Sequence, residues 1–425
     1  MMKKLTSKQF LEQFCTRKAD SGFDPKVLQA VSAILNDVRL EGDQAVQKYT
    51  EQFDGTTSDQ LLVSEVEIQE AKANVAPETL TALKEAAANI RIFHEKQVTP
   101  SRIMAAEEGK QLGQLVLPME RIGIYVPGGT AVYPSTILMN AIPARLAGVK
   151  EIIMVTPVKD NGDIAPVLVA AAEIAGVDKI YKIGGAQAIG ALAYGTDSIA
   201  PVDKIVGPGN AYVAAAKMLV FGQVGIDMIA GPSEVAVIAD ETADPAFIAA
   251  DLLAQAEHDE NARVVLLTNS EDLIQSVEKE LESQLEDMPR KTIASAAIHG
   301  DSALVLTDSV EESFELSNAF APEHLEIQTA DSLSTLGKIK HAGSVFLGSY
   351  APTVLGDYYG GTNHVLPTNG TARFSSGLSV DDFIKKTTYT YYNKEALQHA
   401  RTAITQLTEE EQLIGHGKSI NIRFK

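Results

Sequence analysis

Short apolar runs rich in β-branched residues alternate with alanine- and leucine-rich segments from about residue 120 onward, and this alternation constrains the fold more than any other feature. Continuous apolar runs of this kind are typical of strands buried on both faces, as in parallel sheets joined by crossover helices. Nine such runs exceed one sheet of about five or six strands, so they predict two α/β units. The runs are RIGIYV, EIIMVT, KIYKIG, KIVG, EVAVIAD, RVVLLT, ALVLT, LEIQT and SVFLG.

The two ends of the chain have a helical pattern instead. The first twenty residues predict an amphipathic helix. Asp24 followed by Pro25 predicts the N-cap and first turn of another helix, and PETLTALKEAAANIRIFHEKQ predicts a third with one apolar face. The last fifty residues, from TTYTYYNKEALQH onward, return to this pattern. The sequence therefore predicts two α/β units flanked by helical segments.

Charge and hydropathy exclude several classes of protein. The net charge of -20 argues against a nucleic-acid partner, because neutralising phosphates requires clustered Lys and Arg, and it equally disfavours anionic membranes. No apolar run approaches the roughly 20 residues that cross a bilayer. The first residues contain two lysines but no continuous apolar segment after them, so we expect no signal peptide and a cytoplasmic location.

Cys15 is the single cysteine of the chain. One cysteine excludes an internal disulfide, a cysteine-based zinc site and a CxxC redox pair. Cys15 could in principle act as a nucleophile. It follows QFLEQF on an apolar helical face with no histidine nearby, and this setting favours a packing role.

Three turns are rich in glycine and proline, each after a predicted strand and before a predicted helix. Backbone amides at such helix N-termini can bind phosphate. The turns are YVPGGTAVYPST (125–136), GGAQAIG (184–190) and VGPGNAYV (206–213). None is a complete dinucleotide fingerprint, because Tyr212 stands where the third glycine of the nearest match would be. Nucleotide binding and tight structural connections both remain open.

Gln255 and His258 are three residues apart at the end of a predicted helix, so we expect them to share a face. An amide oxygen and an imidazole nitrogen are both acceptable ligands for a borderline metal cation. A hydrated C-terminal turn is the alternative, since the polar residues DEN follow soon after.

Glu323 and His324 follow Pro322, which is expected to end the preceding helix. A turn at this point would hold a carboxylate and an imidazole next to each other, as two proton-transfer groups for one substrate. A strand that began at Glu323 would instead direct the two side chains to opposite faces. A chance pairing of an acid with a histidine in a loop is an equal alternative.

The irregular stretch 348–379 is longer than ordinary loops, and its glycines allow close approach of a ligand, so we expect Asp357 within it to be functional. In the tail EEEQLIGHGK, a solvated acidic run and a helix C-cap are the ordinary interpretation. Gln255, His258, Asp357 and His416 could together supply nitrogen and oxygen donors for one divalent ion, zinc or manganese. The histidines expected at the surface are His94, His299, His341 and His399.

Eight segments of the chain resemble the histidinol dehydrogenase family. They occur in the family's order, and the resemblance extends from about residue 25 to the end, including Glu411 and His416. The segments are YVPGG, GGAQAIGALAYGT, VDKIVGPGNAYV, AGPSEVAVIAD, LLAQAEHD, APEHLEI, AGSVFLG and GDYYGGTNHVLPT.

The resemblance implies the NAD-dependent four-electron oxidation of L-histidinol to L-histidine through L-histidinaldehyde, the last steps of histidine biosynthesis. It also implies a homodimer with shared active sites. The implied fold is α/β, with two incomplete Rossmann-like parallel-sheet domains plus small N-terminal and C-terminal helical extensions. The expected division is an arm at 1–25, a first domain of 26–124 with 235–377 holding metal and catalytic residues, a second domain of 125–234 contacting NAD, and a tail of 378–425 reaching the partner subunit.

Individual roles follow from the same resemblance. It implies Zn²⁺, with Mn²⁺ as an alternative, bound by Gln255, His258, Asp357 and His416. It implies proton transfer by Glu323 and His324. It implies NAD contacts by Tyr125, Gln187 and Asn210. Substrate contacts are implied for Ser233, His364 and Glu411, beside His324 and the metal ligands. Gly415 and Gly417 flank His416 and make its surroundings more flexible than the resemblance implies.

Other functions remain open at this stage. An NAD dehydrogenase for a different amino alcohol would share these features, because the specificity of a pocket is not readable from a sequence. A metallohydrolase would use Glu323 to activate a metal-bound water, with the glycine turns purely structural. A non-catalytic metal-binding relative is disfavoured by the intact Glu323–His324 pair.

Overall fold

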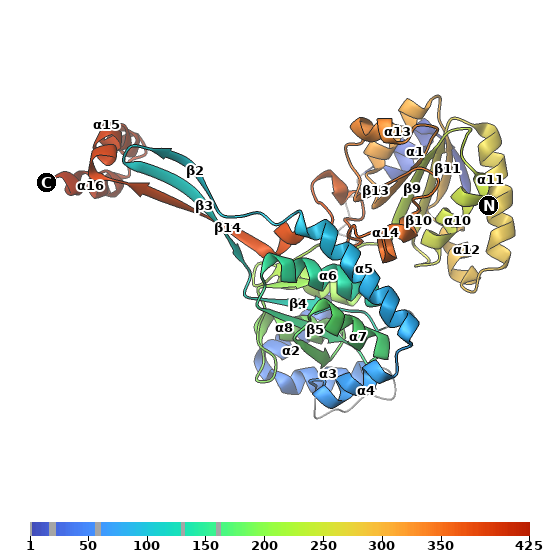
Figure 1. Ribbon diagram of the computed structural model, residues 1–425, viewed down its shortest axis with the longest axis horizontal. Coiled ribbons are helices and arrows are strands. Elements are labelled where there is room, and N and C mark those ends of the chain that lie inside the picture. The colour runs from blue at the N-terminus through green and yellow to red at the C-terminus, as the bar shows by residue number, and fades with distance from the viewer. Residues whose placement is uncertain (1, 17–22, 56–60, 129–131, 159–162) are drawn as a thin grey trace.

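The computed structural model describes residues 2–16, 23–55, 61–128, 132–158 and 163–425. Within these ranges the chain forms two α/β bodies, each built on a parallel sheet, and a long arm that projects from one of them (Figure 1). The nine apolar runs all form strands of the two parallel sheets, so the predicted α/β class is confirmed. No described helix is both long and apolar enough to cross a membrane.

The first body contains a six-stranded parallel sheet in the order β1-β11-β10-β9-β12-β13. Its strands are β1 (Lys3–Thr6), β9 (Glu234–Ala239), β10 (Arg263–Thr268), β11 (Ala303–Leu306), β12 (His324–Gln328) and β13 (Ser344–Leu347). Helices α1 (Ser7–Phe14) and α13 (Val310–Phe320) pack on one face. Helices α10 (Pro245–Ala256), α11 (Glu271–Glu286) and α12 (Lys291–His299) cover the other. Burial on both faces explains why these strands are apolar throughout.

The second body contains a five-stranded parallel sheet in the order β6-β5-β4-β7-β8. Its strands are β4 (Arg121–Tyr125), β5 (Glu151–Thr156), β6 (Lys179–Lys182), β7 (Lys204–Val206) and β8 (Gly225–Ile226). One face packs against α4 (Glu65–Ala73), α5 (Pro77–Glu95), α6 (Pro134–Ala147) and α7 (Pro166–Ala175). The other packs against α2 (Pro25–Glu41), α3 (Asp43–Asp54), α8 (Gly185–Tyr194) and α9 (Ala211–Val220).

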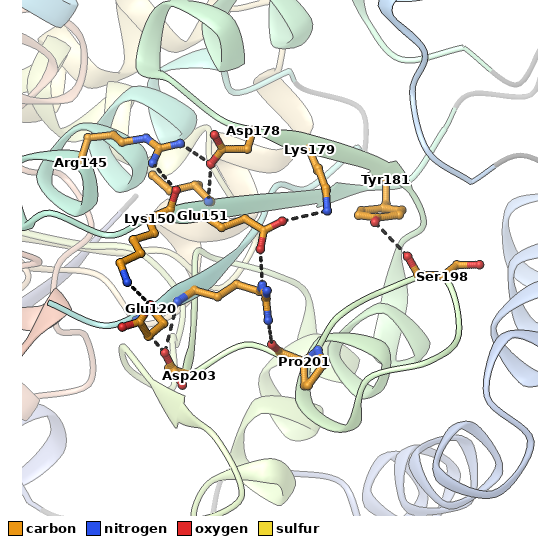
Figure 2. Close-up of polar contacts among 12 residues, drawn as sticks. Glu120, Arg145, Lys150, Glu151, Asp178, Lys179, Tyr181, Ser198, Pro201 and Asp203 are labelled. Carbon is orange, nitrogen blue, oxygen red and sulfur yellow. Dashed lines mark hydrogen bonds and ion pairs between the residues drawn. The ribbon is translucent and has the colours of Figure 1, made fainter.

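Charged side chains close the amino edge of the five-stranded sheet (Figure 2). Glu151, the first residue of β5, pairs with Lys179 at 2.8 Å and with Arg121, the first residues of the neighbouring strands. The Asp178 carboxylate accepts the Ile152 backbone N–H at 2.7 Å. These contacts tie together the strand ends on this side of the sheet.

The arm is a three-stranded antiparallel sheet capped by helices, and it extends away from the six-stranded body (Figure 1). Its elements are β2 (Arg102–Glu107), β3 (Lys110–Pro118), β14 (Ile384–Tyr392), α15 (Lys394–Glu410) and α16 (Ile414–Asn421). At its base, Lys204 Nζ lies 2.9 Å from Asp382 Oδ1. The arm is built from two segments, 102–118 and 384–421, that are far apart in the sequence.

Several segments differ from the sequence-based expectation. Residues 3–6 add the edge strand β1 to the six-stranded sheet, so the N-terminal segment is not a separate helical arm. Residues 384–392 pair with β3 instead of continuing the C-terminal helix. The helices between residues 25 and 95 pack on the five-stranded sheet, because their apolar faces complete its two cores. The structure thus groups 25–95 with 121–226, which differs from the expected pairing of 26–124 with 235–377.

His94 is fully buried, contrary to the surface position expected for it. Its Nδ1 donates to the Ile90 carbonyl at 2.8 Å, and its Nε2 lies 3.3 Å from Asn363 Nδ2. Both ring nitrogens are therefore satisfied, and burial lowers the pKa of His94 and favours the neutral ring.

Candidate active site

A cavity of about 750 Å³ collects most of the residues singled out in the sequence. It lies against the amino ends of β9 and β12 in the six-stranded sheet and against the turn that joins β7 to α9 at the carboxyl edge of the five-stranded sheet. The expected site residues that line it are Asn210, Ser233, Gln255, His258, Glu323, His324, Asp357 and His364. The site lies between the amino edge of one parallel sheet and the carboxyl edge of the other. Its residues therefore come from segments that are far apart in the sequence.

The backbone of Glu234 holds the Glu323–His324 pair in place. The N–H of Glu234 donates to Glu323 Oε2 at 2.8 Å, and its carbonyl accepts from His324 Nδ1 at 3.0 Å. Helix α13 ends at Phe320, and its C-cap Ala321 has a φ of 56°, so the chain turns sharply and Glu323 directly precedes the first residue of β12. Glu323 Oε2 lies 3.6 Å from His324 Nδ1, which is the adjacency that the turn geometry required.

His324 presents its other nitrogen to the cavity. Because Nδ1 donates to a carbonyl, a neutral ring carries its proton there and has a lone pair at Nε2. That Nε2 is buried, has no hydrogen-bond partner among the described residues, and lies 3.7 Å from Asp357 Oδ1. Nε2 is therefore the atom of His324 that can accept a proton from a ligand.

Burial and charge shift the pKa of both members of the pair. Burial raises the pKa of Glu323 to about 7, although the neighbouring His324 charge opposes this. Burial alone would lower the pKa of His324, but the carboxylates of Glu323 and Asp357 outweigh it and raise that pKa to about 9. A cation bound nearby would lower both values. Glu323 can therefore exchange protons near neutral pH, whereas His324 is protonated there unless a bound cation lowers its pKa and favours the neutral ring.

Three of the four expected metal ligands lie together. Gln255 is in the last turn of α10, His258 lies just beyond the helix end, and Asp357 is on the short helix α14 (Thr353–Tyr358) rather than in an irregular loop. Burial lowers the pKa of His258, so its imidazole is neutral, the form that binds metals. Amide, imidazole and carboxylate donors fit Zn²⁺ or Mn²⁺.

The fourth expected ligand, His416, lies elsewhere. It is exposed on α16, and Glu411 is exposed at the end of α15; both helices are at the far end of the arm (Figure 1). Neither residue lines the cavity. Among the described residues, no group of three or more His, Cys, Asp or Glu side chains forms a complete metal site. One chain thus provides three donors, one of them an amide.

The expected NAD contacts lie at the carboxyl edge of the five-stranded sheet. Tyr125 ends β4 and its hydroxyl accepts the Gly185 N–H at 3.1 Å, while burial raises its pKa to about 12. Gln187, in the first turn of α8, is fully buried, and both its amide atoms lack partners among the described residues. Asn210 caps α9 by accepting the N–H groups of Tyr212 and Val213 at 3.0 and 3.1 Å. Of these three expected contacts, Asn210 lines the cavity and the other two do not.

Two structural features of the site were missed in the sequence. Glu234, buried at the start of β9, holds both proton-transfer groups; a charged residue opening a continuous apolar strand was the available signal. A buried ion pair between Lys217 and Asp227 holds the glycine turn before Asn210, through the carbonyl and N–H of Gly207 at 2.9 and 2.8 Å. Spacing gave no indication of that second pair.

Comparison with known proteins decides the family. The family model described as histidinol dehydrogenase matches residues 17–424. The chain belongs to the histidinol dehydrogenase family. It is 51% identical over 420 residues to a histidinol dehydrogenase from Listeria innocua, covering 99% of this chain and 98% of the relative. It is 53% identical over 399 residues to one from Bacillus cereus, covering 94% and 93%.

A solved structure supports the same conclusion. The crystal structure of histidinol dehydrogenase from Elizabethkingia anophelis superposes with a TM-score of 0.94 at 42% identity and covers 99% of this chain and 96% of that one. Membership of the histidinol dehydrogenase family identifies the chain as an oxidoreductase and supports a place in histidine biosynthesis.

Proposed function

We propose that the protein catalyses the NAD-dependent oxidation of L-histidinol to L-histidine through L-histidinaldehyde. Membership of the histidinol dehydrogenase family supports the substrate. The observation that carries the chemistry is the buried, unpartnered Nε2 of His324 in the cavity, with Glu323 beside it and both held by the Glu234 backbone.

Each group takes a defined proton. In the first oxidation His324 accepts the hydroxyl proton of histidinol at Nε2 as hydride leaves the adjacent carbon. Glu323 then accepts a proton from the water that adds to the aldehyde carbon. After releasing its first proton to solvent, His324 accepts a hydroxyl proton of the resulting hydrate as the second hydride leaves. NAD, when bound, supplies the two-electron acceptor in each oxidation, so two NAD are reduced per histidinol.

Gln255, His258 and Asp357 would hold Zn²⁺ or Mn²⁺, which would supply a fixed positive charge to orient the substrate amine and imidazole. We propose that His416 completes the ligand set from the partner subunit of a homodimer and that Glu411 contacts the substrate there. The position of α16 far from its own cavity supports this, as do the exposed apolar side chains near the arm's end, Leu407, Leu413, Ile414 and Ile422. A cytoplasmic location stays a prediction.

The decisive experiment is the yield of NADH per histidinol with zinc-loaded protein. A ratio of two supports oxidation to the acid, whereas a ratio of one would limit the enzyme to the aldehyde. If histidinol gave no NADH and another amino alcohol did, that amino alcohol would be the substrate. Hydrolysis without NADH would favour a metallohydrolase.

Histidinaldehyde oxidation, measured separately, tests the two proton acceptors. His324→Asn should abolish both oxidations, and Glu323→Gln should chiefly block the aldehyde step. Unchanged aldehyde turnover in Glu323→Gln would remove Glu323 from this role.

Mixing chains tests the shared site. Two inactive variants, His416→Ala and His258→Ala, should recover activity in heterodimers, because one of the two cavities then has a full ligand set. Verified heterodimers without activity would contradict a shared site.

A further inference from the structure

Strand β12 carries buried polar side chains beyond the proton-transfer pair. His324, Glu326 and Gln328 alternate along the strand and so share one face of the sheet. Glu326 and Gln328 have exposed fractions of 1% and 4%. Their strand neighbours at the level of Glu326 are Val237 and Phe346, both apolar. Polar groups in such surroundings need hydrogen-bond partners within the protein.

The partners come from the two helices that carry the expected metal ligands. Glu326 Oε1 accepts the backbone N–H of Thr353, the first residue of α14, at 2.7 Å. Gln328 Nε2 donates to Glu326 Oε2 at 3.1 Å and to Asp251 Oδ2 of α10 at 3.0 Å. The carboxyl groups of Asp251 and Glu326 thus lie next to each other around a single amide nitrogen. One network therefore joins β12, α10 and α14.

Two carboxyl groups in this arrangement hold one proton between them. Both accept from the same amide nitrogen, and two carboxylates so close in a buried site do not ionise together. Burial raises the pKa of Glu326 to about 8, and the charge of Asp251 adds to the effect. The other ionisable groups on the packed strands and on α14 are Glu234 of β9, His324 of β12, and Asp357 and Tyr358 of α14, and Asp251 is the one that shares the Gln328 amide with Glu326.

The helix geometry connects this pair to the site. Gln255 follows Asp251 by four residues, about one turn of α10. Asp357 follows Thr353 by four residues in the six-residue helix α14, so anchoring its first N–H fixes the whole helix. A displacement at either anchor would move a metal donor directly.

We propose that Asp251 and Glu326 form a carboxyl pair that shares one proton, fixes α10 and α14 against β12, and thereby positions Gln255 and Asp357 for the metal. They are positioning residues, since neither lines the cavity. The metal part of this proposal rests on the proposed function, whereas the shared proton is a property of the metal-free protein.

Two substitutions separate positioning from simple loss of a charge. Glu326→Gln keeps an oxygen for the Thr353 N–H, the contact that anchors α14, and loses only the bond donated by Gln328 Nε2, so zinc affinity should stay within about threefold of wild type. Glu326→Leu removes both contacts and should weaken zinc binding by about 10- to 100-fold, the usual effect of losing groups that orient metal ligands. Zinc affinity is measured on metal-free protein by competition with a chromophoric chelator.

The pH dependence of thermal unfolding tests the shared proton without any metal. The pKa of Glu326 is raised from 4.5 to about 8 on folding, so the folded state holds a proton that the unfolded state releases. The stabilisation relative to Glu326→Gln should therefore be fully present below about pH 4.5, shrink as the pH rises toward 8, and level off above it. This readout needs only the Gln variant, so it stands even if Glu326→Leu does not fold.

The outcomes distinguish the separate claims. Wild-type zinc affinity in folded Glu326→Leu would overturn the positioning role. A difference in unfolding temperature that does not vary with pH would overturn the shared proton. Failure of the wild-type protein to bind zinc, together with the expected pH profile, would refute the metal part of the proposed function and leave the carboxyl pair intact.

Discussion

Replacing Lys217 with methionine should destabilise the five-stranded body markedly. Lys217 and Asp227 form an ion pair whose side chains are 3% and 1% exposed. Lys217 Nζ also donates to the Gly207 carbonyl at 2.9 Å. Methionine keeps much of the apolar stem but leaves the Asp227 carboxylate buried without a counter-ion. Removing one partner of such a pair costs about 3 to 5 kcal/mol.

The assay is thermal unfolding, and the measured quantity is the midpoint temperature at which the five-stranded body unfolds. At about 2 to 4 °C per kcal/mol for a body of this size, the midpoint should fall by about 6 °C or more. Lys150→Met is the matched control, because the Lys150–Glu120 pair is exposed (72% and 66%) and should contribute less than about 1 kcal/mol. The double variant Lys217→Met/Asp227→Asn should recover part of the loss, since no charge stays buried. A fall in Lys217→Met no larger than in the control would refute the reasoning.

Three further predictions concern the turn, the thiol and the metal. Gly207→Ala should raise the KM for NAD at least tenfold in steady-state assays. Gly207 has a φ of 106°, and a Cβ there would lie 2.2 Å from the Tyr125 carbonyl oxygen. An unchanged KM would exclude the turn from cofactor binding. Burial raises the pKa of Cys15 from 9.0 to about 11, so iodoacetamide should modify it at pH 8 about 100-fold more slowly in folded than in unfolded protein. Equal alkylation rates would show that the thiol is accessible and ionised. Chelation should abolish histidinol oxidation and added zinc should restore it, and activity that survives complete metal removal would refute the metal role.

The sequence predicted the parallel strands well because burial on both faces leaves a strong, continuous apolar signal. It did not predict β14, whose residues IKKTTYTYY are mostly exposed and lie directly before a real helix. The β2–β3 hairpin was missed although Gly109, with a φ of 72°, marks its turn. Strands with little burial depend on their partner, and the partner of β14 is more than 250 residues away.

The site was predictable in its residue types but not in its assembly. Gln255 and His258 share a helix end, and their proximity could be inferred from spacing. Whether Asp357 and Glu323 lie near Gln255 and His258 depends on which strands are neighbours in the sheet. That information is contained only in the strand order β9-β12-β13. The Glu234 contacts are made by its backbone, so the charged side chain at the start of an apolar strand could mark the position but not the contacts.

The arm also has a consequence for the order of events during protein synthesis. Strand β3 ends at Pro118, but its partner β14 begins at Ile384, so the hairpin of β2 and β3 waits with one edge unpaired while about 260 intervening residues emerge from the ribosome. The two α/β bodies can fold in that interval, since their strands all precede residue 348. Any contact that the complete arm makes with a second chain must therefore form after the strands of both α/β bodies have been translated. Nascent chains stalled before residue 384 should expose β3, and a chaperone that binds unpaired strands would find its target there.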